Sequence, residues 1–564
     1  MLKRIFLLFA ILISNFIFCD WAQDTLQQMN LEDKIAQLFI ISVDNRNLID
    51  QNKRTDELQD RIINVNDPKT LKKNAAELII KKYNVGGVHF TDYGNIRSCY
   101  KAINKFQLIS KIPLLITQDF EWGLNMRLTD AIKFPKNMTL GAIQNNDLIY
   151  QLGQEIGRQC RALGVHVNFS PVIDINSNPE NPVIGFRSFG DNPESVAKKG
   201  IKMMQGLQSE GVFACAKHFP GHGDTSVDSH YDLPVINRSK TEIQNCELYP
   251  FKKLIEAGVK VIMPGHIYIP ALDDTTNRPI TLSKTVITDI LQNQLGFCGL
   301  IITDALNMKG VSKFFKPGKI ELEAFLSGND MLLMPIDFEV AKNTLRDAIV
   351  QNSKLLRELD RRVLKILKAK QELKLHNSNF NFNKNFSYSE FYKKNASDLK
   401  KLLHQEAITI VTDLQKNIPF TNNNKTALVQ FGDTEKNNFY KLLLNYYPKI
   451  NYYKFDDKHQ ENFQNLSECD YIIISLFDIK KSAKSNYGIS SQFLDFYNKL
   501  SKTNKKIILV IFGDVYSLNL FKDINNNSTI IMAYEDDEDA QKAVAKVIAG
   551  KIKAKGKLPV NICK

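Results

Sequence analysis

The chain has 564 residues and a formal net charge of +13 at pH 7; 43% of its residues are hydrophobic and 24% are charged. This composition is that of a globular protein and excludes a disordered, collagen-like or coiled-coil chain, and the length suits about three domains, or two if one is a large α/β barrel. Lysine is spread along the chain, with no arginine-rich stripe interleaved with aromatic residues. We therefore expect no nucleic-acid partner.

The first residues have the pattern of an export signal. Lys3 and Arg4 supply positive charge, and residues 5–18 form an apolar stretch that is too short to span a bilayer comfortably. Residues 1–19 are therefore predicted to be a signal peptide. A lipid anchor on Cys19 is the alternative, although a bulky aromatic residue precedes this cysteine. No later apolar run approaches 18 residues, so we expect an exported protein, periplasmic or extracellular, without a stable membrane span.

Residues 20–375 alternate short apolar runs with longer segments of helical periodicity, such as residues 194–209 and 340–349. Eight such repeats predict an α/β fold, a (β/α)8 barrel of the TIM type. An open doubly wound sheet with insertions would show a similar pattern. The expected strands are residues 36–43, 85–90, 113–118, 166–175, 212–218, 259–264, 299–303 and 330–335.

A second, smaller domain is predicted after the barrel. Residues 376–395, rich in Asn, Phe and Lys, are expected to be a linker, and residues 396–564 an α/β sandwich domain with a parallel sheet. This part of the sequence holds no G-x-x-x-x-G-K-[ST] phosphate loop, so nothing in it indicates ATP binding. The expected strands are residues 407–411, 427–431, 471–476, 507–512 and 529–533.

Polar residues collect just past the predicted barrel strands. Active sites of TIM-type barrels lie at the carboxyl ends of the strands, so these residues are the candidates for catalysis and binding. Five strand ends, or the loops that follow them, carry such residues: Asp119, Asp174 with Arg187, Lys217 with His218, His266, and Asp304.

The segment of residues 217–230 is the densest, and three interpretations apply to it. Its glycines, prolines and aspartates are typical of a surface turn. Its histidines and aspartates are also metal ligands, but proline and glycine prevent a helix from placing two histidines on one face, and Lys217 would oppose a divalent ion, so no metal site is predicted. Third, Asp228 and His230 lie two residues apart, and a carboxylate bonded to an imidazole makes an acid/base dyad.

These residues resemble a known family. The sequence K-H-F-P-G-H-G-D-T-x-x-D-S-H at 217–230 is similar to the signature of family 3 glycoside hydrolases, in the bacterial β-N-acetylglucosaminidase branch. Four more segments resemble the family in its order: F-P-K-N-M-T-L-G-A (134–142), N-F-S-P-V-I-D-I (168–175), I-T-D-A-L-N-M (302–308) and G-N-D-M-L-L-M-P (328–335). The second domain, with G-K-L-P-V at 556–560, resembles more weakly the C-terminal sandwich domain of two-domain members.

The resemblance implies a role for individual residues. Asp304 would be the nucleophile of a retaining mechanism, which needs an ionised carboxylate on one face of the anomeric carbon and a proton donor near the leaving oxygen. His230 would be the acid/base, supported by Asp228, with Asp224 as the alternative acid. The resemblance assigns binding of the terminal sugar to Asp119, Arg127, Arg187, Lys217 and His218.

One position departs from the family pattern. The segment D-x-E-G-G reads D-F-E-W-G at residues 119–123, so Trp122 replaces a glycine. Glycine permits close approach of the backbone, whereas tryptophan can stack on a sugar face. We therefore expect the pocket to differ from the family on this side.

The sequence thus predicts an exported, retaining β-N-acetylglucosaminidase without a cofactor. Its expected substrates are peptidoglycan fragments or chitin-type oligosaccharides with a terminal β-linked GlcNAc. A family 3 β-glucosidase is one alternative, although that branch generally takes its acid/base from a later segment. GlcNAc phosphorylase activity at the same site is another. A non-catalytic wall-binding protein is a third, against which the intact Asp228, His230 and Asp304 argue.

Overall fold

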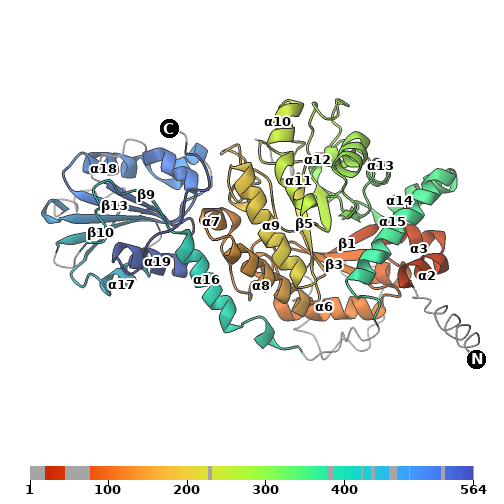
Figure 1. The fold of residues 1–564 in the computed structure, drawn as a ribbon, viewed down its shortest axis with the longest axis horizontal. Helices are drawn as coiled ribbons and strands as arrows, with labels where there is room; N and C mark the ends of the chain where they lie inside the picture. The colour runs from red at the N-terminus through yellow and green to blue at the C-terminus, as the bar shows by residue number, and fades with distance from the viewer. Residues whose placement is uncertain are drawn as a thin grey trace, which may run out of the picture.

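The chain folds into two lobes, with α16 (Lys394–Ala407) leading into the second of them (Figure 1). The computed structural model describes residues 20–44, 76–225, 232–377, 386–420, 424–432, 438–455, 466–481, 483–521 and 528–562. The predicted signal peptide, residues 1–19, lies outside this part of the chain. Within the described ranges no helix is both long enough and apolar enough to cross a membrane.

The first lobe is a barrel of eight parallel strands in the order β7-β6-β5-β4-β3-β2-β1-β8. A single parallel bridge between Ile302 and Met331 joins the two outer strands and closes the barrel. The predicted (β/α)8 architecture is confirmed. The strands are β1 (Phe39–Asp44), β2 (Gly87–Thr91), β3 (Leu115–Gln118), β4 (Val167–Asn168), β5 (Phe213–Phe219), β6 (Val261–Pro264), β7 (Leu300–Ile301) and β8 (Leu332–Leu333).

Strand β4 is much shorter than the apolar run at 166–175 suggested. Pro171 has no N–H group, so the regular ladder stops before it and resumes as one bridge between Val172 and Lys217. The remainder of the run is still buried beside β5, and the carbonyl of Pro171 accepts from Lys217 N at 3.3 Å. This irregular stretch places Asp174 at the end of β5, next to His218.

Helices cover the outside of the barrel. In α8 the buried residues Leu148, Leu152, Ile156 and Leu163 recur at helical spacing, and the helix ends at Gly164 with φ +92°. The helices are α2 (Trp21–Gln28), α3 (Leu31–Gln37), α6 (Ile96–Ile109), α7 (Asn137–Ala142), α8 (Asp147–Leu163), α9 (Pro193–Ser209), α10 (Lys240–Asn245), α11 (Leu248–Glu256), the π-type η5 (Thr285–Gln294), α12 (Lys309–Ser312), α13 (Lys319–Ser327), α14 (Phe338–Val350) and α15 (Ser353–Glu372).

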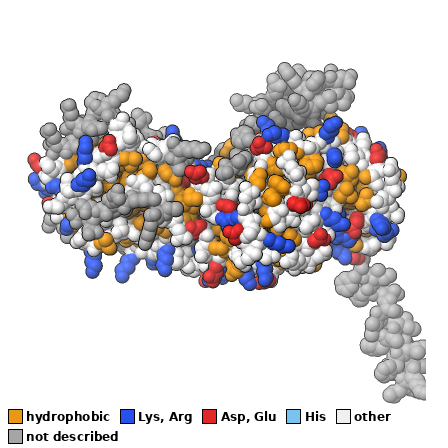
Figure 2. Space-filling model, turned by 90° about the horizontal axis from the view of Figure 1, so that it is seen from above, with side chains coloured by type: hydrophobic (Ala, Val, Ile, Leu, Met, Phe, Trp, Pro, Cys, Tyr) orange, Lys and Arg blue, Asp and Glu red, His pale blue; other side chains and the backbone are white. Residues whose placement is uncertain are grey.

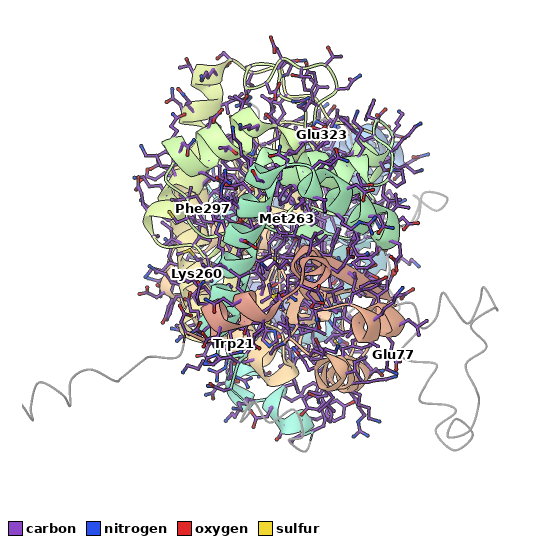
Figure 3. The ribbon with its side chains drawn as sticks, turned by 90° about the vertical axis from the view of Figure 1, so that its right-hand side faces the viewer. Trp21, Glu77, Lys260, Met263, Phe297 and Glu323 are labelled. Atoms are coloured by element: carbon purple, nitrogen blue, oxygen red, sulfur yellow. The ribbon has the colours of Figure 1, made fainter. Side chains whose placement is uncertain are left out.

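The two ends of the barrel face different surroundings. Figure 3 views the side away from the second lobe and labels Lys260 and Phe297, which precede β6 and β7, with Met263 of β6 nearer the middle. The carboxyl ends of the strands lie at the opposite end, where α7 and the loop after β4 contact the second lobe. The second lobe therefore borders the end at which barrel active sites form.

The second lobe contains a six-stranded sheet in the order β11-β10-β12-β13-β14-β9. The prediction of a wholly parallel sheet is wrong, because the edge strand β9 runs antiparallel to β14. The sequence also gave no sign of β11, an exposed edge strand of polar and tyrosine residues that forms no apolar run. The strands are β9 (Thr409–Thr412), β10 (Thr426–Phe431), β11 (Asn451–Lys454), β12 (Tyr471–Leu476), β13 (Lys506–Ile511) and β14 (Ser528–Met532).

Helices lie on both faces of this sheet. Along β10, Leu428 joins a cluster with residues of α17 (Phe439–Leu444) and α19 (Glu538–Ile548), whereas Ala427 and Val429 face the side of α18 (Ser491–Ser501). This alternation makes the three-layer α/β sandwich that was predicted. On the face drawn in Figure 2, Lys and Arg side chains are scattered over both lobes and form no continuous stripe.

Candidate active site

One cavity of about 280 Å³ lies at the carboxyl ends of the barrel strands. Asp228 and His230, the expected acid/base dyad, lie outside the described residues. Asp224, the alternative acid, does not line the cavity and forms an ion pair with Arg238 at 2.6 Å. Six of the expected site residues line the cavity together: Asp119, Arg127, Arg187, Lys217, His218 and Asp304.

Asp119 follows β3 and meets basic side chains on several sides. Its carboxylate lies 2.6 Å from the Lys217 amine, 3.4 Å from Arg127 and 3.5 Å from the His89 ring. Burial raises the pKa of Asp119, but Lys217, His89 and Arg127 outweigh burial and hold the pKa well below its usual value. The cavity wall therefore keeps an ionised acceptor suited to sugar hydroxyl groups.

Glu121, two residues further on, is fully buried and was not among the expected site residues. The Arg187 guanidinium donates to both of its oxygens, at 2.7 and 3.0 Å, and the Lys217 amine lies 3.0 Å away. Burial raises the pKa of Glu121, yet the two cations lower it to about 2. Asp119 and Glu121 thus face three cations, Lys217, Arg127 and Arg187, and we call these five residues the charged cluster.

His218 is held by Asp174, from the irregular stretch after β4. Asp174 accepts from the His218 ring at Nδ1 (2.7 Å), from His218 N (3.1 Å) and from His222 N (2.7 Å). Burial raises the pKa of Asp174, and the two histidines lower it overall. Because a guanidinium only donates, the contact of 3.5 Å between Arg187 and His218 Nε2 fits the tautomer that carries its proton on Nδ1.

Asp304 follows β7 and is stabilised in its ionised form. Ala305 N donates to its Oδ1 at 2.8 Å. Burial raises the pKa of Asp304, but His218, His266, the Ala305 N–H and Lys217 lower it below its usual value. Asp304 does not cap a helix, because α12 begins five residues later with Met308 at its N-cap. Its carboxylate therefore faces the cavity and is not used as a helix cap.

Trp122, which replaces a glycine of the family pattern, does not line this cavity. Its ring packs edge-on against Phe186 at 5.8 Å, and the Lys136 amine lies 4.4 Å from the Phe186 ring. Phe186 and Lys136 border a second cavity of about 260 Å³, between the two lobes. In the described part of the chain no group of three His, Cys, Asp or Glu residues is arranged to hold a metal ion.

The model of the glycosyl hydrolase family 3 N-terminal domain matches residues 30–369. The chain belongs to this family. It is therefore a glycoside hydrolase, and its barrel is the domain that the family model describes.

One curated relative is similar along both lobes, and another over a shorter stretch. The chain is 29% identical over 559 residues to beta-hexosaminidase A of Pseudoalteromonas piscicida, covering 87% of this chain and 92% of that protein. A beta-hexosaminidase of Nitrosomonas eutropha is 37% identical over 240 residues, which are 41% of this chain and 68% of the relative.

Solved structures are similar along nearly the whole chain. A family 3 beta-N-acetylglucosaminidase from Paenibacillus sp. str. FPU-7 has a TM-score of 0.74 at 26% identity, covering 95% of this chain and 99% of that one. Beta-glucoside phosphorylase BglX has a TM-score of 0.76 at 22% identity, covering 96% and 95%, and shows the shared fold.

The charged cluster leads to a prediction about stability. Glu121→Gln leaves the buried Lys217 and the partly buried Arg187 short of one negative charge, so the unfolding free energy of the barrel should fall by about 3 kcal/mol. Tryptophan fluorescence during denaturation measures this directly, because both tryptophans, Trp21 and Trp122, lie in the barrel. Asp232→Asn is the control, since the pair of Asp232 with Lys313 is exposed and should contribute nothing measurable. Equal denaturation midpoints for Glu121→Gln and Asp232→Asn would contradict the prediction.

Proposed function

We propose that this protein is an exported, retaining β-N-acetylglucosaminidase that removes terminal β-linked GlcNAc from peptidoglycan fragments or chitin-type oligosaccharides. The observation that carries the proposal is the single cavity in which the ionised Asp304 lies with the charged cluster and His218. The names of the relatives support the choice of sugar. The N-terminal sequence of residues 1–19 supports export, and such substrates occur outside the cytoplasm.

The charged cluster supplies both kinds of group that a sugar needs. Asp119 accepts hydrogen bonds from sugar hydroxyls, while Arg127, Arg187 and Lys217 donate to hydroxyl or carbonyl oxygens. The fork between Arg187 and Glu121 fixes the guanidinium before the sugar arrives, so little side-chain entropy is lost on binding. An acetamido group adds one carbonyl acceptor to the sugar, which suits the charged cluster, because its three cations outnumber its two carboxylates.

The chemistry proceeds in two displacements. Asp304 attacks the anomeric carbon while the bond to the leaving oxygen breaks, and His230 gives its proton to that oxygen. A covalent glycosyl-aspartate results. His230 then takes a proton from water, the water oxygen attacks the anomeric carbon, and Asp304 is released as a carboxylate. Two inversions give overall retention, and Asp228 supports the imidazolium in each cycle.

A β-glucosidase is the second candidate, favoured by one relative. A protein of Cellulomonas fimi named beta-N-acetylglucosaminidase/beta-glucosidase is 28% identical over 368 residues. We expect a panel of aryl β-glycosides that differ at the sugar to decide between the two, with the 2-acetamido-glucoside cleaved much faster than the glucoside, galactoside or xyloside. An equal or faster rate on the plain glucoside would reject the proposed specificity.

The role of Asp304 has a direct chemical test. Asp304→Ala should abolish turnover without loss of the fold, because the covalent route needs this carboxylate. A 2-fluoro-sugar inactivator should label the peptide that contains Asp304 in the unmodified protein, as mass spectrometry of a digest would show. Label on a peptide with Asp119 or Asp224 instead would show that Asp304 is not the nucleophile.

The role of His230 is tested by the leaving group. His230→Ala should slow substrates with poor leaving groups far more than activated aryl glycosides, because only the former need a proton on the departing oxygen. The measurement is a plot of kcat/KM against leaving-group pKa for both proteins. Parallel plots would indicate that His230 only positions its loop.

A further inference from the structure

The second lobe contacts the barrel at several places, among them α7 and the loop that carries Arg187 in the wall of the 280 Å³ cavity. We propose that Glu535, which follows β14, is a positioning residue for Arg187, and that the second lobe uses it to fix this arginine in the cavity. The inference rests on the proposed function in one respect, because it takes Arg187 to contact the sugar. Each link between Glu535 and Arg187 is a direct contact between described residues.

The first link joins Glu535 to α7. Glu535 Oε1 accepts from the backbone N–H of Lys136 at 2.7 Å and from the hydroxyl of Thr139 at 2.6 Å. Glu535 is largely buried, so water has little access to its carboxylate. Breaking these two hydrogen bonds would therefore cost free energy. Both bonds end on the same oxygen, which makes Glu535 a single anchor for the first turn of the helix.

The second link joins α7 to the backbone of Arg187. Asn137 Nδ2 donates to the Arg187 carbonyl at 2.7 Å, and the Lys136 amine lies over the neighbouring Phe186 ring. The helix and the loop also touch directly, since a Cβ atom on Gly141 would lie 2.1 Å from the Phe189 carbonyl oxygen. A shift of α7 would therefore move the Arg187 backbone.

A third set of contacts supports the same loop from its other side. Asp191 N donates to the Pro559 carbonyl at 3.1 Å, and Asn561 N donates to Asp191 Oδ2 at 2.6 Å. Lys557 N donates to the Ala142 carbonyl at the end of α7, at 3.0 Å. These residues of the second lobe include the G-K-L-P-V segment, which therefore helps to support the loop that carries Arg187.

The backbone before Glu535 adds an independent observation. Tyr534 has φ +65°, a left-handed conformation that is unfavourable for a residue with a side chain. Its hydroxyl is held by Thr409 at 2.7 Å inside the second lobe. A strained residue directly before the anchor is the kind of feature that persists where the local geometry serves a function.

The test compares variants of Glu535 in the full-length protein on the best aryl glycoside. Glu535→Ala should lower kcat/KM by about tenfold, mainly through a higher KM, because a displaced Arg187 binds the sugar less well. Glu535→Gln should keep kcat/KM close to that of the unmodified protein, since its one amide oxygen can accept both hydrogen bonds. Glu538→Ala is the matched control: Glu538 lies three residues away, is exposed and pairs only with Lys542 in the contacts described, so its kinetics should match the unmodified protein.

A double-mutant cycle separates positioning from general loosening of the interface. In an Arg187→Lys background, Glu535→Ala should change kcat/KM by less than about twofold, because the fork that it positions is already gone. A full tenfold effect in that background, or no effect of Glu535→Ala in the unmodified protein, would overturn the proposal. If Glu535→Ala does not fold, Thr139→Val removes one of the two bonds and should give a smaller rise in KM.

Failure of the proposed activity can be distinguished from failure of the positioning role of Glu535. If the unmodified protein cleaves no glycoside, the proposed activity is wrong, and the positioning role is then decided by calorimetric binding of free GlcNAc. Weaker binding by Glu535→Ala, restored in Glu535→Gln, supports the role. Binding that is equal in all variants, or absent from the unmodified protein, rejects it.

Discussion

Glu121 is a carboxylate enclosed by the barrel, and it remains ionised because Arg187 and Lys217 lie against it. An isolated charge in such a place would cost several kcal/mol, and a buried ion pair rarely repays this cost in stability. Its value lies in geometry. Arg187 comes from the loop after β4, Lys217 from β5, and Glu121 from the segment after β3, so one buried carboxylate aligns three separate parts of the cavity wall.

The two lobes contribute to the candidate site in different ways. The barrel supplies the charged groups at its strand ends, where short parallel strands converge on one side. None of the residues described in the sandwich lines the 280 Å³ cavity. The sandwich instead contacts α7 and Asp191, which belongs to the loop that carries Arg187 into the cavity wall. The second cavity lies between the lobes, beside α7. Phe186, whose ring packs against Trp122, lines it.

Much of this structure could be predicted from apolar runs and the residues that follow them. The eight barrel strands bury both faces, so each forms a short apolar segment, and six expected site residues meet because parallel strands end together. Strand β11 escaped prediction because an exposed edge needs no apolar run. The antiparallel direction of β9 depends on contacts far along the chain. Glu121 and His89 were missed as site residues, and the contact of Asp174 with His218 was not predicted, because these residues act on other side chains and only folding shows which residues they contact.

The contact between the second lobe and the loop of Arg187 also sets an order of events during synthesis. The hydrogen bond from Asn561 to Asp191 joins residues 370 positions apart. At a synthesis rate of about 5–20 residues per second, roughly 20–75 seconds separate the emergence of its two partners. Throughout this interval the barrel can fold, yet the loop that carries Arg187 lacks its outer support. A ribosome-bound chain therefore holds an unfinished sugar site until residue 561 has been made.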